Sequence, residues 1–357
     1  MNAEKRDKVS ENSGEASISI IVPVFNEAEA IPHFAKNMIP VIETVSDLLG
    51  PQGEVELLFI DDGSSDATVA QVFSLKNFPA RVHLVKLSRN FGKDNALAAG
   101  LAMAKGDAVV PMDVDLQDPP EILPKMVAAW LKGAKVVNAL RSDRSSDSWF
   151  KRTSAGAFYR TYNRIADTPL EPNVGDFRLL DREVVNVLNS MPERIRFMKG
   201  MFSWVGYSPV HVEYTRPERV AGQTKWKIWP LWNFALDGIT GSTTLPLRIW
   251  TYFGGVVAFG ALLYAIVIVF RTIVHGIEVP GYASLMVVLL TIGALNMIAL
   301  GILGEYIGRI AVEVRQRPLY IIEMAQEISQ ADETKSPEAK RNALLHSDTD
   351  YHAVGQD

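Results

Sequence analysis

The stretch ISIIVPVFNE, residues 18–27, opens a series of short apolar runs that alternate with helix-like segments. Residues 18–24 are almost all apolar and rich in β-branched side chains, which is typical of a buried strand. Further runs of this kind follow, with room for one helix between neighbours. The alternation predicts an α/β, Rossmann-like domain with right-handed βαβ units and a mostly parallel sheet. The expected strands are 18–24, 55–60, 82–87, 108–112 and 135–140, and the expected helices lie near 30–49, 66–76, 95–104 and 120–132.

Four of the expected strands end in polar turns. Taken singly, each turn could be an ordinary loop or helix N-cap. Ligands of open α/β sheets bind outside the carboxyl ends of the strands, so four polar exits on one edge favour a single crevice. The exit residues are Pro23, Phe25, Asn26 and Glu27; Asp61 to Ser65; Ser88 to Lys93; and the motif MDVDLQDPPE, residues 112–121.

The acidic motif indicates a metal site. Asp113 and Asp115 follow the fourth strand with one apolar residue between them, so both carboxylates can approach one hard cation. Mg²⁺ typically takes one or two protein carboxylates together with substrate phosphates and water. Because the chain has no Gly-x-x-x-x-Gly-Lys-Ser/Thr loop, we expect the metal to hold the phosphates. Glu121 suits the first turn of the following helix.

The composition excludes some classes of site and partner. The 357 residues include no cysteine, which rules out disulfides and thiolate metal sites. A net charge of -5 gives no basic field for nucleic acid, so no nucleic-acid partner is expected. The first seventeen residues are polar and lack the apolar run of a secretory signal, so the N-terminal part is expected in the cytosol.

Two uncharged apolar stretches, residues 249–270 and 282–303, are predicted to be transmembrane helices. Two buried helices of a large soluble domain are a less favoured reading. Arg309, Arg315 and Arg317 follow the second stretch, which places both long ends in the cytosol. Glycine and other small residues in the stretches would permit close helix packing and a homo-oligomer. Tryptophans 226, 229 and 232 indicate an interfacial helix before the first span.

These patterns divide the chain into six parts. The expected limits are a disordered N-terminus at 1–17, a catalytic domain at 18–224, an interfacial helix region at 225–247, two transmembrane helices within 248–304, a cytosolic juxtamembrane segment at 305–329 and a disordered tail at 330–357.

Five motifs in fixed order carry a resemblance to a known family: VPVFNE, IDDGSSD, LSRNFGKDNALAAG, MDVDLQDPPE and GDFRLLDR. They resemble family 2 glycosyltransferases with the GT-A fold. Within that family the chain is similar to the polyprenyl-phosphate glycosyltransferases, relatives of dolichol-phosphate mannose synthase, and in particular to bacterial bactoprenol glucosyltransferases. The likeness covers about residues 18–322, hairpin included.

The resemblance implies roles for matching positions. Contacts with the nucleotide sugar are implied for Pro23, Phe25, Asn26, Glu27, Asp61, Asp62, Asn90, Lys93 and Asp113. Metal binding is implied for Asp113 and Asp115, and positions at the reacting centre for Gln117, Asp118, Asp176 and Arg178. Cations that could bind the acceptor phosphate are Arg196, Lys199, Arg219 and Lys225. The last two match a pre-membrane motif that usually reads Gly-x-Ser-Lys-Tyr, from which this chain departs at Thr224 and Trp226.

The implied reaction is the inverting transfer of a hexose, with glucose favoured, from a UDP-sugar to undecaprenyl or another polyprenyl phosphate. Mg²⁺ or Mn²⁺ would be the cofactor. The product would be a lipid-linked monosaccharide for O-antigen or cell-envelope glycosylation, made at the cytosolic face of the bacterial inner membrane by a multi-pass protein. A flippase and a downstream transferase are the implied partners. Asp176 is either a base or a group that orients sugar or acceptor and pairs with Arg178, because a phosphate monoester is already largely dianionic at pH 7.

Three alternatives stay open at this point. The sugar could be aminoarabinose, mannose or galactose, because the hydroxyl contacts that select it are not visible in the sequence. The chain could be a processive polysaccharide synthase, although the Gln-x-x-Arg-Trp motif of that class is absent. It could also be a non-catalytic, lipid-binding membrane partner, since a fold alone does not establish turnover.

Overall fold

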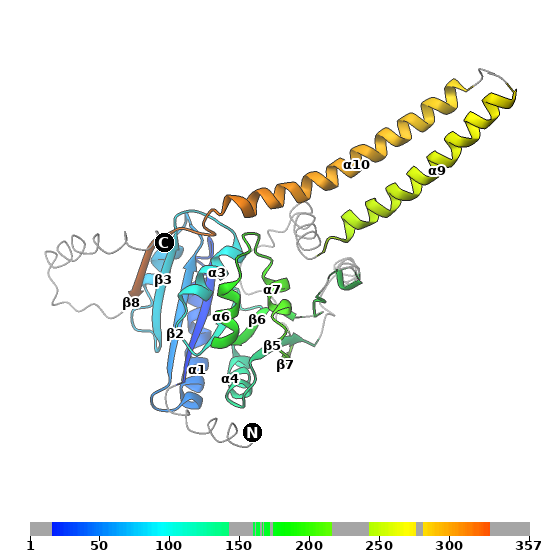
Figure 1. Cartoon of the computed structure of the whole chain (residues 1–357). Coiled ribbons are helices and arrows are strands. Elements are labelled where there is room, and N and C mark those ends of the chain that lie inside the picture. The colour runs from blue at the N-terminus through cyan, green and yellow to red at the C-terminus, as the bar shows by residue number, and fades with distance from the viewer. Residues whose placement is uncertain are drawn as a thin grey trace, which may run out of the picture.

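The computed structural model describes residues 16–142, 174–215, 243–275 and 281–328, together with 160, 162–164, 166 and 168–171. A central sheet carries helices on both faces, and a pair of long helices extends away from this domain (Figure 1). The expected disordered N-terminus (within 1–15), most of the interfacial helix region (within 216–242) and the tail from residue 329 lie outside the described residues.

The described strands and helices follow the predicted pattern through the first half of the chain. The strands are β1 (Ser17–Val24), β2 (Glu54–Asp61), β3 (Arg81–Leu87), β4 (Ala108–Pro111), β5 (Val136–Arg141), β6 (Val174–Asp181), β7 (Val210–Tyr214) and β8 (Ile322–Ile328). The helices are α1 (Ala30–Leu49), α2 (Thr68–Phe73), α3 (Lys93–Met103), α4 (Leu123–Leu131), α6 (Arg182–Ser190), α7 (Met198–Trp204), α9 (Leu245–His275) and α10 (Tyr282–Arg315), with a 3₁₀ turn at Pro120–Ile122.

The sheet has the strand order β7-β5-β6-β4-β1-β2-β3-β8. Its centre is parallel as predicted, because β4, β1, β2 and β3 pair in parallel. The sequence did not predict that β6 inserts antiparallel between β4 and β5. Nor did it predict β8, which comes after the helical hairpin and pairs antiparallel with β3. The segment expected to be a plain juxtamembrane stretch is therefore partly the edge strand of the sheet.

Alternating side chains of β1 build two cores, one on each face of the sheet. Ile20 packs in the core that also contains Phe34 of α1, whereas Ile21 packs in the core below α3. A Cβ on Gly100 of α3 would overlap the Ile21 side chain, so glycine lets this helix approach the sheet closely. The close approach fixes the start of α3, at Lys93, above the carboxyl ends of the strands.

The two predicted apolar stretches form α9 and α10, which run side by side as a hairpin (Figure 1). Large apolar side chains are exposed along both helices, among them Tyr252, Phe259, Ile273, Leu285 and Met297. Among the described residues no helix is long and apolar enough to span a membrane, contrary to the prediction from sequence.

Candidate active site

The exits of β1 and β2 are joined by hydrogen bonds between their loops. Asn26 has a left-handed backbone conformation, with φ of 54°, and its N–H donates to Oγ of Ser64 at 2.9 Å. Its side-chain Oδ1 accepts from the N–H of Ser65, also at 2.9 Å. The N–H of Glu27 donates to Oγ1 of Thr68 at 2.8 Å. The predicted Asn26 and Glu27 are thus held against the loop after β2.

Two buried carboxylates organise the loops after β2 and β3. Asp62 is 4% exposed and accepts hydrogen bonds from the N–H groups of Phe91 (2.7 Å) and Gly92 (2.9 Å). Asp61 is fully buried and accepts from the N–H of Ser64. Burial raises the pKa of both carboxyls, against the lowering effect of these hydrogen bonds. Both side chains therefore fix loop geometry, and their contact with a nucleotide stays a prediction.

Lys93 links two carboxylates that come from different strands. Its Nζ lies 2.8 Å from the carboxylate of Asp113, after β4, and 3.0 Å from Oδ2 of Asp176 on β6. Because β6 runs antiparallel to β4, the chain brings Asp176 back to the carboxyl end of β4. The structure thus assembles three predicted site residues in one cluster, which we call the Lys93 cluster.

The charge of Asp176 is fixed by this cluster. Burial alone would raise its pKa, but the charges of Lys93 and Lys199 and the hydrogen bond from Lys93 bring the pKa to about 2. Among the described side chains, Lys93 forms an ion pair with Asp176, and the charge of Arg178 also lowers the pKa of Asp176. The guanidinium of Arg178 donates to the carbonyl of Gly175 at 2.6 Å and lies over the ring of Phe202. A carboxylate with such a low pKa is a weak general base, which favours an orienting role for Asp176.

In the rest of the acidic motif, Asp115 and Gln117 are half-buried and Asp118 is buried. Oδ1 of Asp115 accepts from the N–H of Gln117 at 3.1 Å, around a left-handed Leu116. Asp118 is 8% exposed and accepts a hydrogen bond of 2.8 Å from the hydroxyl of Tyr214 on β7. Tyr214 was not predicted, because nothing in its local sequence indicates that β7 would lie near the motif.

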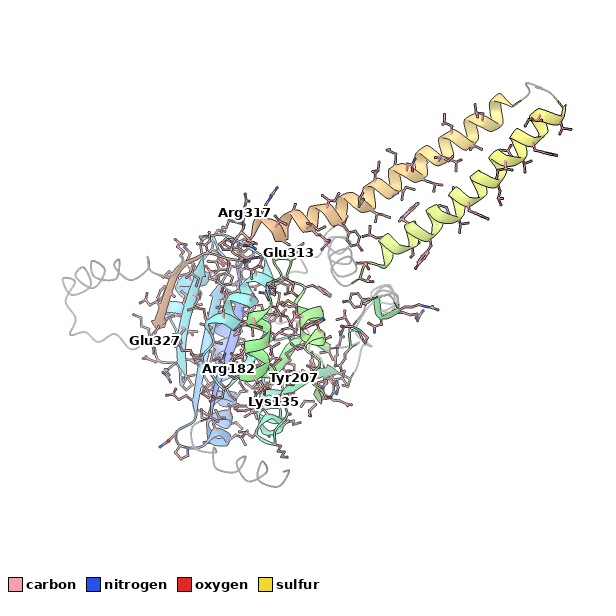
Figure 2. All side chains as sticks on the ribbon, in the orientation of Figure 1. Lys135, Arg182, Tyr207, Glu313, Arg317 and Glu327 are labelled. Atoms are coloured by element: carbon pink, nitrogen blue, oxygen red, sulfur yellow. The ribbon has the colours of Figure 1, made fainter. Side chains whose placement is uncertain are left out.

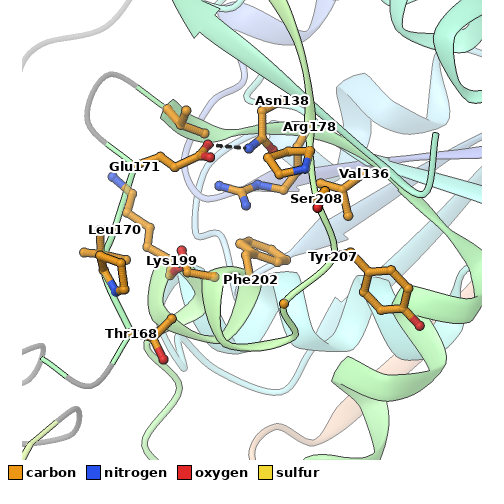
Figure 3. Close-up of a pocket in the computed structure, with 15 residues that line it drawn as sticks. Val136, Asn138, Thr168, Leu170, Glu171, Arg178, Lys199, Phe202, Tyr207 and Ser208 are labelled. Atoms are coloured by element: carbon orange, nitrogen blue, oxygen red, sulfur yellow. Dashed lines mark hydrogen bonds between the residues drawn. The ribbon is translucent and has the colours of Figure 1, made fainter. Parts of the chain in front are cut away.

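A pocket of about 380 Å³ is linked to the Lys93 cluster by two lining residues whose charges act on Asp176. Arg178 and Lys199, both predicted site residues, line it together with Phe202 and Glu171, and Figure 3 shows these side chains around the cavity. Glu171 accepts a hydrogen bond from Asn138 at 2.9 Å. The pocket therefore offers two cations, and the charges of both lower the pKa of Asp176.

Of the other three predicted cations, one lies within the described residues, and it is not among the residues that line this pocket. Arg196 donates to the carbonyls of Leu188 (3.3 Å) and Met191 (2.8 Å), so its guanidinium binds the C-terminal end of α6. Arg219 and Lys225 lie outside the described residues. Of the four cations predicted to bind the acceptor phosphate, Lys199 is the one that the structure places in the pocket.

Asp94 was missed in the sequence and lies beside the same cluster. Burial raises its pKa to about 6, and the negative charge of Asp176 adds to the rise, while Lys93, Lys199 and the N–H of Met198 oppose it. Its position could have been suspected from the motif NFGKD, since an acidic residue in the first turn of a helix is common. Only the packing of α7 against α3 shows that it is buried next to other charges.

The raised pKa of Asp94 predicts a pH-dependent cost in stability. The folded state binds a proton more tightly than the unfolded state, whose pKa is near 3.8, so stability falls as pH rises from about 4 to about 6. Asp94→Asn stays neutral and should melt higher than the wild type at pH 8, by at least about 2 °C. The difference should vanish near pH 4. Thermal melts followed by circular dichroism measure both values.

The exposed Asp47 of α1 supplies the control for this measurement. Asp47→Asn should change the melting temperature equally little at both pH values. An Asp94→Asn protein that melts below the wild type at pH 8 would contradict the assignment.

The carboxylates of Asp113 and Asp115 suit a divalent cation whose other ligands come from substrate phosphates. Asp113 and Asp115 follow β4 with one residue between them, and hard cations prefer such oxygen ligands. Within the described part of the chain, no group of three or more His, Asp or Glu side chains could hold a metal. The protein thus offers two carboxylates, the number that Mg²⁺ commonly takes when phosphates supply the other ligands.

Comparison with known proteins identifies the family. Residues 19–188 match the model of glycosyl transferase family 2, and residues 245–310 match that of the GtrB C-terminal hairpin. A prophage bactoprenol glucosyl transferase homolog of Escherichia coli is 50% identical over 305 residues, which cover 85% of this chain and 98% of that protein. The chain belongs to glycosyl transferase family 2. It is a glycosyltransferase, and its residues 245–310 match the hairpin model.

Other proteins are also similar in sequence to this family 2 glycosyltransferase. The bactoprenol glucosyl transferase of Shigella phage SfII is 51% identical over 85% of this chain and 97% of its own length. An uncharacterized glycosyltransferase of Synechocystis is 44% identical over 85% of this chain and 94% of its own length. Among solved structures, glucosyl-3-phosphoglycerate synthase of Mycobacterium tuberculosis matches with a TM-score of 0.41 and 23% identity, over 63% of this chain and 76% of that one.

Proposed function

We propose that this protein transfers a glucosyl group from UDP-glucose to bactoprenol (undecaprenyl) phosphate, with inversion at the anomeric carbon. The observation that carries the proposal is the identity of 50% or more, over nearly the full length, with proteins named bactoprenol glucosyl transferase. The polar edge of the sheet supports it, because residues from four strand exits lie at that edge, where ligands of open α/β sheets bind.

The donor side of the crevice holds Asp113, Asp115 and Lys93. A divalent ion bound by the two carboxylates would act as a Lewis acid on the diphosphate leaving group. Lys93 adds a fixed positive charge beside them, since its ammonium group is already held by Asp113 and Asp176. Asn26 and Glu27, held by the loop after β2, would form the nucleotide end of the same crevice.

The acceptor side needs cations more than it needs a base. The second pKa of a phosphate monoester is near 6, so at pH 7 the attacking oxygen of the lipid phosphate carries no proton. That oxygen forms the new bond to the anomeric carbon while the bond to UDP breaks and its electron pair leaves with the diphosphate. Arg178 and Lys199 line the pocket next to Asp176 and would hold the incoming phosphate.

The hairpin would bring this site to its lipid substrate. Its exposed apolar side chains include Tyr252 at 73%, Ile273 at 77% and Leu285 at 67%. An apolar surface of this extent is normally covered by lipid or by another chain. We assign this surface of the hairpin to contact with the inner face of the bacterial plasma membrane, where a long-chain lipid presents its phosphate to the cytosol.

Purified full-length protein should make one lipid-linked monosaccharide. The assay combines the protein in lipid vesicles with undecaprenyl phosphate, Mg²⁺ and a panel of radiolabelled UDP- and GDP-sugars. Labelled lipid from UDP-glucose alone is the expected result. If labelled lipid forms from another donor instead, that donor's sugar is the one transferred. A long polymer would indicate a processive synthase. If no donor gives a product, enzymatic transfer to this acceptor is contradicted.

A further inference from the structure

The last turns of α10 are bound to a distant segment that precedes α7. The carboxylate of Glu313 accepts hydrogen bonds from the N–H of Arg194 at 2.9 and 3.0 Å and from the N–H of Ile195 at 3.1 Å. These partners lie 119 and 118 positions away in the sequence. Figure 2 shows Glu313 where α10 meets the catalytic domain. A carboxylate that binds two adjacent backbone N–H groups gives strong, directional hydrogen bonds.

The bound segment leads directly to the acceptor pocket. Four residues after Ile195, the first turn of α7 carries Lys199, which lines the pocket beside Asp176. Asp94 of α3 also interacts with this turn, through the N–H of Met198. Lys199 therefore lies in a short segment that contacts both α3 and the last turns of α10.

The chain that follows the hairpin contacts the end of β3 and the loop after it. The N–H of Ser88, in the loop that leads to Lys93, donates to the carbonyl of Ile321 at 2.9 Å. Lys86 of β3 forms an ion pair of 2.8 Å with Glu323 of β8. The chain that leaves α10 thus contacts the loop on the donor side, while Glu313 contacts the segment on the acceptor side.

The junction is not closely filled. A pocket of about 320 Å³ lies between α3, the end of α6 and residues 319–320, and Arg194, Arg196 and Tyr320 are among its lining residues. In a tightly packed core, such a shift would be costly. Because this pocket lies beside the contact with Glu313, the segment that contains Arg194 can shift together with α10 without a clash.

We propose that Glu313 is a positioning residue through which the hairpin sets Lys199 in the acceptor pocket. The position of α10 then controls how well the lipid phosphate is recognised, whereas the donor site is bound independently of Glu313. This inference rests on the proposed function, because it assigns Lys199 to the acceptor phosphate.

The kinetic test separates acceptor from donor. In Glu313→Ala the KM for undecaprenyl phosphate should rise about fivefold or more, the range of ordinary coupling between sites, with the KM for UDP-glucose unchanged. Glu313→Gln keeps one acceptor oxygen for the two N–H groups and should lie between the wild type and the alanine variant. Glu305→Gln, two turns earlier on α10 and paired with Arg309, is the matched control and should behave as the wild type.

A second measurement does not depend on turnover. Amide hydrogen exchange of the full chain should increase at residues 194–202 in Glu313→Ala and not in Glu305→Gln. Unchanged exchange there, or an acceptor KM equal to that of the wild type, overturns the role of Glu313. A general loss of turnover with both KM values unchanged overturns it too. If the wild type itself transfers no sugar, the proposed function fails, and the exchange result still decides whether Glu313 holds the segment.

Discussion

Asp115→Asn should lower the rate of sugar transfer about a thousandfold, the loss expected when a charged group that stabilises a leaving group is removed. Asp115 stands at the exit of β4, and its amide replacement keeps the shape and the hydrogen bond from the N–H of Gln117. The variant should therefore fold normally and lose only charge. The rate of incorporation of labelled glucose into undecaprenyl phosphate measures the change.

Chelation should have the same effect on the wild type. EDTA should abolish transfer, and added Mg²⁺ or Mn²⁺ should restore it, whereas neither treatment should alter the residual rate of Asp115→Asn much. Asp47→Asn, at an exposed position of α1, serves as the control and should retain full activity. Full wild-type activity in metal-free buffer would rule out the metal site at Asp113 and Asp115.

Breaking the Lys93 cluster should produce the second large effect. In Lys93→Met the carboxylates of Asp113 and Asp176 lose the ammonium between them, and their charges then repel the diphosphate of the donor. We expect kcat/KM to fall about a hundredfold in Lys93→Met and in Asp176→Asn, typical of one lost electrostatic contact in an active site. The double variant should be little worse than either single one, because residues that act as a unit are not additive.

The pH profile distinguishes the two roles of Asp176. Since its pKa is about 2, the residue is ionised throughout the usual assay range. A change in activity near pH 6 would come from the acceptor phosphate or from Asp94, whose pKa is also about 6, so Asp176→Asn should keep a change in activity near that pH. Lys135→Met breaks an ion pair of 3.0 Å with Asp181 at the other end of the sheet and should leave kcat/KM unchanged. Independent, multiplicative losses in the double variant would show that Lys93 and Asp176 do not act together.

Much of the first half of the fold could be predicted because the sequence patterns that indicate its strands and helices are local. An apolar run such as residues 18–24 has the pattern of a buried strand whatever lies next to it, and α1 was predicted with its observed limits. β8 escaped prediction for the opposite reason. Its sequence, IEMAQEI, has polar residues at several positions and is mostly exposed, so it becomes a strand only because β3 offers an unpaired edge.

The candidate active site also has a part that could be predicted from the sequence and a part that could not. The order of the motifs by itself determined that Asn26, Asp62 and Asp113 would lie at one edge of the sheet, since parallel strands all end there. The tertiary structure decided which charges meet: Asp176 pairs with Lys93 because β6 enters antiparallel beside β4. It also decided that Asp118 is held by a tyrosine of β7 and that Glu313 reaches the segment before Lys199. Side-chain periodicity is a property of neighbouring residues, whereas these contacts depend on the register of strands and helices that are far apart in the chain.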